Sequence, residues 1–288
     1  MTAAAFLAVR SRRHRSLLRD GLTIAALAYL AWVWQFLLAT GTHVDAGAYL
    51  RAAAGDPYFV SQAGRESAFL YSPVIAQLLT PLASVPPFVF YSGLLAVSLL
   101  GAVYLVGPML AAVALLTPLP FVWQDLGSGN IHVLLAAAIV LGFRFPVAWS
   151  FVLLTKLTPG IGLLWFAARR EWRALGLALG ATALLAAGSF LLAPALWAEW
   201  ITVLRTNAGE TPTGLFVPVP LPVRLALAAA LVWWGARRGY AWSVPLAATL
   251  ALPVIWIYDG FAMLLGVVSV LRRPMVSSSS AHVSSGRG

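Results

Sequence analysis

The chain has 288 residues, of which 61% are hydrophobic and only 10% charged, and its formal net charge is +10. A soluble domain of this size needs a polar surface that such a composition does not supply, so we predict a protein embedded in a membrane. The sequence has no cysteine, which excludes disulfides, thiol catalysis and cysteine metal sites. The positive charge is concentrated at helix ends, which is typical of membrane orientation and argues against nucleic-acid binding.

The chain begins with a basic segment, residues 1–20, followed by a long apolar run. Because that run, Leu22–Thr40, is longer than the core of a secretory signal, we predict an uncleaved first helix at Gly21–Thr40. A more polar stretch follows at Gly41–Tyr71, which we place outside the membrane with a short surface helix at Ala46–Ala54.

Ten further apolar runs follow, broken by single prolines and glycines, and none shows the alternation of an outer-membrane barrel. We therefore predict an all-α, polytopic transmembrane helical bundle over residues 21–273 with about eight to ten membrane passes. The tail, residues 274–288, is low in complexity and is predicted to be disordered. The runs are Pro73–Val85, Pro87–Val106, Met109–Trp123, Ile131–Phe143, Val147–Leu157, Gly160–Ala168, Ala174–Leu192, Val223–Ala236, Ala241–Ile257 and Phe261–Leu271.

Arginine clusters predict the orientation of the bundle, because basic residues accumulate in cytoplasmic loops. With these clusters inside, both termini are cytoplasmic, and seven of the nine acids lie outside. Such a distribution suggests a polar cavity facing outward, although exposed loops need polar residues in any case. The clusters are the N-terminal arginines, Arg169–Arg173, Arg237–Arg238 and Arg272–Arg273.

Lys156 is the only lysine, and it lies in the apolar stretch Phe151–Leu164. An ammonium group in the hydrocarbon region is unfavourable by roughly 2.5–3.5 kcal/mol on insertion scales. It therefore calls for a partner, a water-filled cavity or an anionic ligand, unless it extends to the interface from a helix end. The segment Thr155–Gly160 is predicted to break this helical run, which favours an anion site, where a compact point charge suits phosphate.

Asp45 is the most informative acid, since it follows the first helix directly at the membrane surface. Apolar surroundings raise the pKa of a carboxyl, which suits a general base, but Asp45 also has the position of an N-cap for the helix Ala46–Ala54. Asp56 precedes Pro57 in a pattern typical of a turn. Asn130 and Ser128 are candidate caps for the next helix. No histidine pair has metal-binding spacing, so we expect no metal site.

Taken in order, several of these pieces resemble glycosyltransferase family 87, within the GT-C class of membrane enzymes. The resemblance spans roughly residues 20–270. It implies a polytopic enzyme that transfers a sugar, typically mannose, from a polyprenyl-phosphate carrier to a glycolipid or glycan outside the cytoplasm, without a cofactor. The pieces are Asp45 and Tyr49, Gly55–Tyr58, Phe69 with Tyr71 and Pro73, Gly129–Asn130 with Leu134 and Leu135, Lys156 with Pro159, and Arg169–Arg173.

By this resemblance Asp45 is the catalytic base, and Lys156 is a cation for the departing phosphate. We expect further substrate contacts from Tyr49, Asp56, Tyr71, Asn130, His132 and Asp259. The implied location is a bacterial plasma membrane, with the active site facing outside. Two other readings stay open: a transporter or flippase, which broken helices and a buried cation also suit, and a non-catalytic scaffold.

Overall fold

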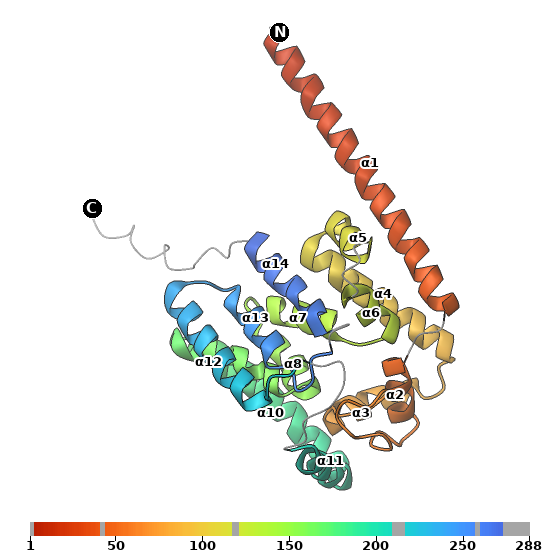
Figure 1. The fold of residues 1–288 in the computed structure, drawn as a ribbon, viewed down its shortest axis with the longest axis vertical. Coiled ribbons are helices and arrows are strands. Elements are labelled where there is room, and N and C mark those ends of the chain that lie inside the picture. The colour runs from red at the N-terminus through yellow and green to blue at the C-terminus, as the bar shows by residue number, and fades with distance from the viewer. Residues whose placement is uncertain (1–2, 41–43, 117–120, 209–216, 257–259, 273–288) are drawn as a thin grey trace, which may run out of the picture.

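A computed structural model describes residues 3–40, 44–116, 121–208, 217–256 and 260–272, with side chains from Ser16 onwards except that of Phe121. Within these ranges the chain is almost entirely helical, and no strand is present, which confirms the predicted all-α class. The predicted tail and Asp259 lie outside the described residues. Figure 1 shows the long helix α1 (Ala3–Thr40) leaning against one side of the remaining helices.

Several helices have the bounds that the apolar runs predicted. Helix α4 occupies Pro87–Val106, with a proline at its first position where no backbone N–H is needed. Helix α10 occupies Trp172–Leu192, and α12 occupies Leu221–Arg238, ending at Gly239. Helix α11, at Pro194–Asn207, was not predicted, because its apolar residues are interleaved with polar ones.

Other predicted runs are split into short helices by the prolines and glycines within them. The structure has α3 (Pro73–Leu79), α5 (Pro108–Leu116), α6 (Phe121–Ser128), α7 (His132–Gly142), α8 (Trp149–Thr155), α9 (Leu164–Ala168), α13 (Ser243–Leu250) and α14 (Leu265–Arg272). Short 3₁₀ turns at Thr80–Leu82, Pro146–Ala148, Thr158–Leu163 (η3) and Gly260–Leu264 (η4) join several of them.

This splitting bears on the number of membrane passes. Three helical stretches in the described part are long and apolar enough to cross a membrane: Ser16–Thr40, Pro87–Val106 and Trp172–Leu192. A fourth span results if Val122–Ser128 and His132–Gly142, bent by 110°, count together. The protein is thus a membrane protein with an α-helical bundle. The predicted eight to ten passes exceed these three or four candidates, and the difference falls on the short helices.

Helix α7 lies at the centre of the molecule. Its residues Leu135 and Ile139 belong to a core formed with α2 (Val44–Ala53), α8, α12 and α13, while Val133 and Ala136 belong to a second core with α1, α4 and α5. Both faces of α7 are buried, which suits a sequence that is apolar all round. A polar group at the start of α7 is consequently held in a fixed position.

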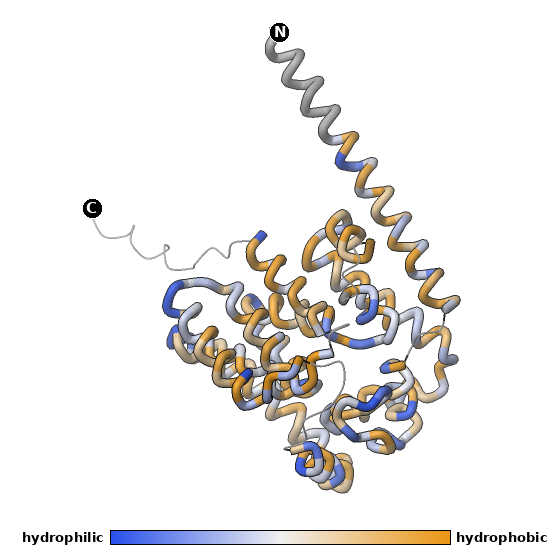
Figure 2. Tube along the Cα trace, in the orientation of Figure 1, coloured by the Kyte–Doolittle hydropathy of each residue, from blue (hydrophilic) through white to orange (hydrophobic). Residues whose placement is uncertain are grey.

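Helix α10 differs, because most of its surface is exposed. Only 11% of its most apolar stretch of 18 residues is buried against other parts of the protein. Leu184, Leu191 and Leu192 are more than 70% exposed, as lipid-facing residues would be. Figure 2 shows hydrophobic colour along α1, α4, α10 and α14, and hydrophilic colour gathered near α2 and α3 and at the end of α12.

The helix ends and the connecting helices are divided between two opposite sides of the molecule. In Figure 1 the start of α1 and the end of α14 lie on the upper side, while α2, α3 and α11 lie on the lower side. Arg169 donates a hydrogen bond to the carbonyl of Ala236 near the end of α12, so two of the arginine clusters lie together. Which side faces the cytoplasm remains a prediction.

Candidate functional site

The candidate site lies where α2 meets the bend between α6 and α7 and the end of α8. The bend is possible because Gly129 adopts a positive φ of 75°. A Cβ atom at this position would come within 2.6 Å of the Cβ of Ala46, so α2 approaches the bend as closely as glycine permits. This close contact brings the first turn of α2 to the start of α7.

Asp45 lies in that first turn of α2, inside the helix. The predicted N-cap position would be the residue just before the helix, so that prediction is wrong. A carboxylate in the first turn is favoured by the partial positive charge of the helix N-terminus. Its Oδ2 accepts a hydrogen bond of 2.9 Å from the side-chain amide of Asn130. The Oδ1 of Asn130 in turn accepts from the backbone N–H of Ile131 at 2.8 Å, which fixes the amide with its NH₂ toward Asp45.

The environment of Asp45 adjusts its basicity. Burial raises the pKa of the Asp45 carboxyl above its ordinary value; the Lys156 ammonium opposes this, the Asp125 carboxylate adds to it, and the Asn130 amide opposes it. The net effect is a raised pKa, so Asp45 binds a proton more strongly than an exposed aspartate. A carboxylate with these properties is suited to removing a proton from a hydroxyl group.

Asp125, at the end of α6, is fully buried and holds the start of α7. Its Oδ1 accepts from the backbone N–H of His132 at 3.3 Å, and its Oδ2 accepts from that of Val133 at 3.1 Å. Asp125 thus accepts hydrogen bonds from the N–H groups at the beginning of α7. The prediction that Asn130 or Ser128 caps this helix is corrected, because neither makes these bonds. Ser128 donates back to the carbonyl of Asp125, and Asn130 bonds its neighbour Ile131.

His132 connects this carboxylate to Lys156. Its Nδ1 lies 2.8 Å from Oδ1 of Asp125, and its Nε2 lies 2.6 Å from Nζ of Lys156. Both Asp125 and His132 are at most 1% exposed. Lys156 follows α8 in an extended conformation, with φ −132° and ψ 102°, before η3 begins at Thr158. The predicted helix break at Lys156 is confirmed.

Tyr49 packs beside Asp45, and Tyr71 stacks on Tyr49. Tyr49 lies one helical turn after Asp45 on the same face of α2, and its hydroxyl is 3.1 Å from that of Tyr71. The two rings stack with centroids 5.8 Å apart, and Phe69 packs edge-on against Tyr71 at 5.2 Å. The backbone N–H of Ser72 donates to the carbonyl of Leu154, which ties this aromatic group to the end of α8.

The structure therefore brings together six of the eight predicted site residues and places a seventh, Asp56, apart from them. Asp56 is exposed in the turn that its Pro57 predicted, beyond the far end of α2, whose last residue, Ala53, lies roughly 12 Å along the helix from Asp45 at 1.5 Å per residue. Asp259 falls outside the described residues. The residues brought together are Asp45, Tyr49, Tyr71, Asn130, His132 and Lys156.

One member of the cluster, Asp125, was not predicted as a site residue. The sequence carried a signal: an acid precedes the next histidine by seven residues, across a Gly-Ser-Gly break between apolar runs. A buried acid in such a place needs partners, and the helix start after the break supplies them. Among described residues, no group of three or more metal-ligating side chains is present.

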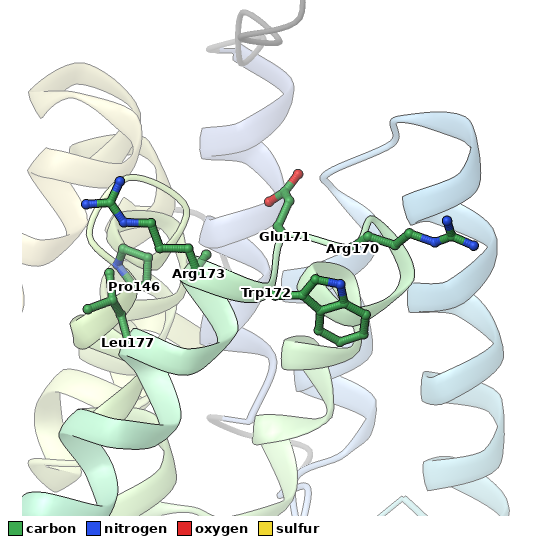
Figure 3. Close-up of a pocket in the computed structure, with 7 residues that line it drawn as sticks. Pro146, Arg170, Glu171, Trp172, Arg173 and Leu177 are labelled. Atoms are coloured by element: carbon green, nitrogen blue, oxygen red, sulfur yellow. The ribbon is translucent and has the colours of Figure 1, made fainter.

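A separate open depression lies at the start of α10, lined by Arg170, Glu171, Trp172, Arg173 and Pro146, among others. In Figure 3 the Arg173 side chain lies over Pro146, whereas Arg170 points away on the other side of Trp172. The segment from Pro146 to Thr155 leads from this depression to Lys156, a separation of roughly 15 Å at helical rise. None of the predicted site residues lines this depression.

Comparison with known proteins supports the resemblance. No curated protein and no solved structure matches the chain. The model of glycosyltransferase family 87 matches residues 69–278, well over half of the chain. The matched segment includes Asn130, His132 and Lys156, whereas Asp45 and Tyr49 precede it. The chain belongs to glycosyltransferase family 87.

Proposed function

We propose that this glycosyltransferase moves a sugar, typically mannose, from a polyprenyl-phosphate carrier to a glycolipid or glycan acceptor, with Asp45 as the general base. The observation that carries the proposal is the meeting of one carboxylate and one ammonium in a single polar cluster. Asp45 and Lys156 are 111 positions apart in the sequence numbering, yet Asn130 bonds Asp45 at 2.9 Å and His132, two residues further on, lies 2.6 Å from Nζ of Lys156.

The two groups match the two charges that develop in such a transfer. As the acceptor oxygen attacks the anomeric carbon, its proton passes to the Asp45 carboxylate, and the bond from that carbon to the carrier phosphate breaks. The departing phosphate gains negative charge, which the Lys156 ammonium stabilises. The raised pKa of Asp45 favours proton acceptance, and the nearby positive charge keeps the carboxyl ionised until then.

The proposed setting follows from the same residues. The carrier's lipid chain enters from the membrane, and the sites for Asp45 and Lys156 face the outer side of a bacterial plasma membrane, with both termini in the cytoplasm. The arginine clusters support this orientation. Tyr49 lies one helical turn after Asp45, and its ring is buried against that of Tyr71, so contact of this pair with the substrate is proposed through the hydroxyl groups.

A transfer assay tests the proposal. Purified protein in nanodiscs is given radiolabelled polyprenyl-phosphate-mannose and membrane lipids, and we expect labelled product from the wild type. Asp45→Asn keeps the shape of the side chain and is expected to lower turnover by about 10²–10⁴-fold, as loss of a general base does. Asp56→Asn, at the far end of α2, is the matched control and should retain activity. Wild-type turnover in Asp45→Asn would exclude Asp45 as the base.

A flippase or a scaffold would behave differently in the same assay. A flippase would move the labelled donor between leaflets without forming a new product, and a scaffold would do neither. The family match favours the transferase, since it covers the segment that contains Lys156 and His132.

A further inference from the structure

We propose that Asp125 and His132 are positioning residues that hold the Lys156 ammonium in place for the donor phosphate, and that protonation of His132 releases it. The inference rests on the proposed role of Lys156 in donor binding and adds a mechanism that orients and regulates it. It starts from the linear arrangement of three side chains: carboxylate, imidazole and ammonium, joined at 2.8 Å and 2.6 Å.

The hydrogen bonds determine where the protons lie. The two oxygens of Asp125 accept hydrogen bonds from two backbone N–H groups, so Asp125 acts as a hydrogen-bond acceptor toward the start of α7. Nδ1 of His132 must then donate its proton to Oδ1 of Asp125. The neutral imidazole is left with an acceptor at Nε2, which faces Nζ of Lys156.

The remaining proton belongs to lysine. An ordinary lysine is more basic than an ordinary histidine by about four pH units, so Nζ is the donor and Nε2 the acceptor in this pair. Asp125 therefore acts on Lys156 through His132: it fixes the tautomer that can accept from an ammonium group. The opposite tautomer would place an N–H against the ammonium and break the contact.

Protonation of His132 has the same consequence as the wrong tautomer, with a second positive charge added. The imidazolium has no acceptor at Nε2, and it repels the ammonium at hydrogen-bond distance. We therefore expect Lys156 to leave its place as the pH falls through the range in which imidazoles change charge.

The other charged groups around His132 are few. Asp125 on α6, Lys156 after α8 and Asp45 on α2 form the cluster itself. Of the described elements packed against α7, α4, α8, α13 and η4 contribute no charged side chain. Arg272 on α14 is engaged elsewhere, with the carbonyl of Val106 at the end of α4. A change in the charge of His132 is thus felt chiefly by Lys156 and the two carboxylates.

The sequence offers an unusually direct readout, because Lys156 is the only lysine. Protein grown with ¹³C,¹⁵N-lysine and freed of any tag lysine gives one lysine side-chain signal, which reports on Lys156 alone. In the wild type we expect the Cε and Nζ shifts to move in one step as the bonded pair of Asp125 and His132 takes up a proton, so the pH of the step belongs to the pair. This measurement needs neither donor nor activity.

Three variants separate positioning from simple folding. His132→Gln retains an N–H for Asp125 and an oxygen for Lys156 but cannot titrate, so the step should vanish while the signal stays near its neutral-pH position. His132→Leu should give the released signal at every pH. His14→Gln, in the N-terminal segment, is the control and should keep the step. Circular dichroism and monodisperse elution confirm that each variant is folded.

Donor binding supplies the second arm. Binding of polyprenyl-phosphate-mannose should be about tenfold weaker or more at roughly pH 5.5 than at roughly pH 7.5 in the wild type, and nearly independent of pH in His132→Gln. A lysine signal that is constant over this range in the wild type, or a step that persists in His132→Gln, overturns the inference. A normal step without any donor binding instead refutes the proposed function and leaves the positioning of Lys156 intact.

Discussion

The side-chain amide of Asn130 donates a 2.9 Å hydrogen bond to the carboxylate of Asp45, and its own oxygen is fixed by the backbone of Ile131. This bond stabilises the charged form of Asp45 and lowers a pKa that burial has raised. A general base must be ionised to act, so activity should fall as the pH drops through the pKa of Asp45.

Removing the amide should move that fall in activity to higher pH. In Asn130→Ala the carboxylate loses a donor while its burial remains, so its pKa rises further and the acid limb of kcat/KM shifts upward. A pH profile of the transfer reaction measures the shift. Thr202→Ala, on α11, is a control for changes unrelated to the cluster. An acid limb that stays in place would show that Asn130 does not act on the base.

Asp45→Asn should raise stability at neutral pH while it removes activity. A carboxyl whose pKa is higher in the folded than in the unfolded state binds its proton more tightly when folded. The contribution of this group to the free energy of unfolding is therefore greatest at pH values below the unfolded-state pKa, and it is lost as the pH rises through the folded-state pKa. At pH 7 the ionised Asp45 is unfavourable for the fold, and neutral asparagine relieves this. Thermal unfolding at pH 7 should show a higher Tm, with a smaller gain near pH 4, and a lower Tm at pH 7 would contradict this balance.

Lys156→Met keeps the apolar stem and removes the charge. If Lys156 holds the carrier phosphate, donor affinity and turnover should both fall, because stabilisation of a leaving group acts mainly in the transition state. If the ammonium only extends to the interface, the change should be neutral or slightly stabilising. Lys156→Arg sharpens the test, since a compact site for a point charge should not accept a planar guanidinium. Full activity in both variants would leave Lys156 without a role in the reaction.

Gly129→Ala should destabilise the protein and separate Asp45 from Asn130. Alanine in the left-handed region is unfavourable by about 1–2 kcal/mol, and the contact at 2.6 Å with Ala46 adds to this. Gly239 is a matched control, because its φ is 76° and no atom lies within 4 Å of its added Cβ. Gly239→Ala should thus show the strain alone. We expect a lower Tm and a larger loss of transfer activity for Gly129→Ala, and equal effects would mean that the approach of α2 is not needed.

The orientation in the membrane can be tested with single cysteines, since the chain has none of its own. Cysteine in place of Glu66, an exposed residue between α2 and α3, should react with an impermeant maleimide added to whole cells. Cysteine in place of Ser279 should react only after the membrane is opened. Labelling of both positions from outside would refute the predicted topology.

Much of the fold could be predicted from apolar runs and prolines, because these determine where a helix begins and ends. The bounds of α4 were predicted to the residue, and α2 was predicted to within two residues. Helix α11 was missed because its residues are not a continuous apolar run. The count of passes was not recovered, since runs of similar composition became short broken helices as well as long ones.

The candidate site shows a similar limit. Asp45 and Lys156 could be selected singly, because an acid after a first helix and a lone lysine in an apolar run each need an explanation. Their common cluster could not be predicted, since it depends on the approach of Ala46 to Gly129 and on the 110° bend before α7. Asp125 was missed because its contact with His132 depends on the 110° bend between their two helices, and because its other partners are backbone N–H groups.

The bond between Asp125 and His132 also bears on how the chain enters the bilayer. Both residues belong to one helix pair, bent by 110°, and are separated by seven positions, so their contact forms within that pair. A helix pair that has paired its own acid and imidazole carries fewer unmet polar groups into the lipid. We expect α6 and α7 to insert as one unit during synthesis. Asp45, made earlier, and Lys156, made later, would then join a centre that is already formed.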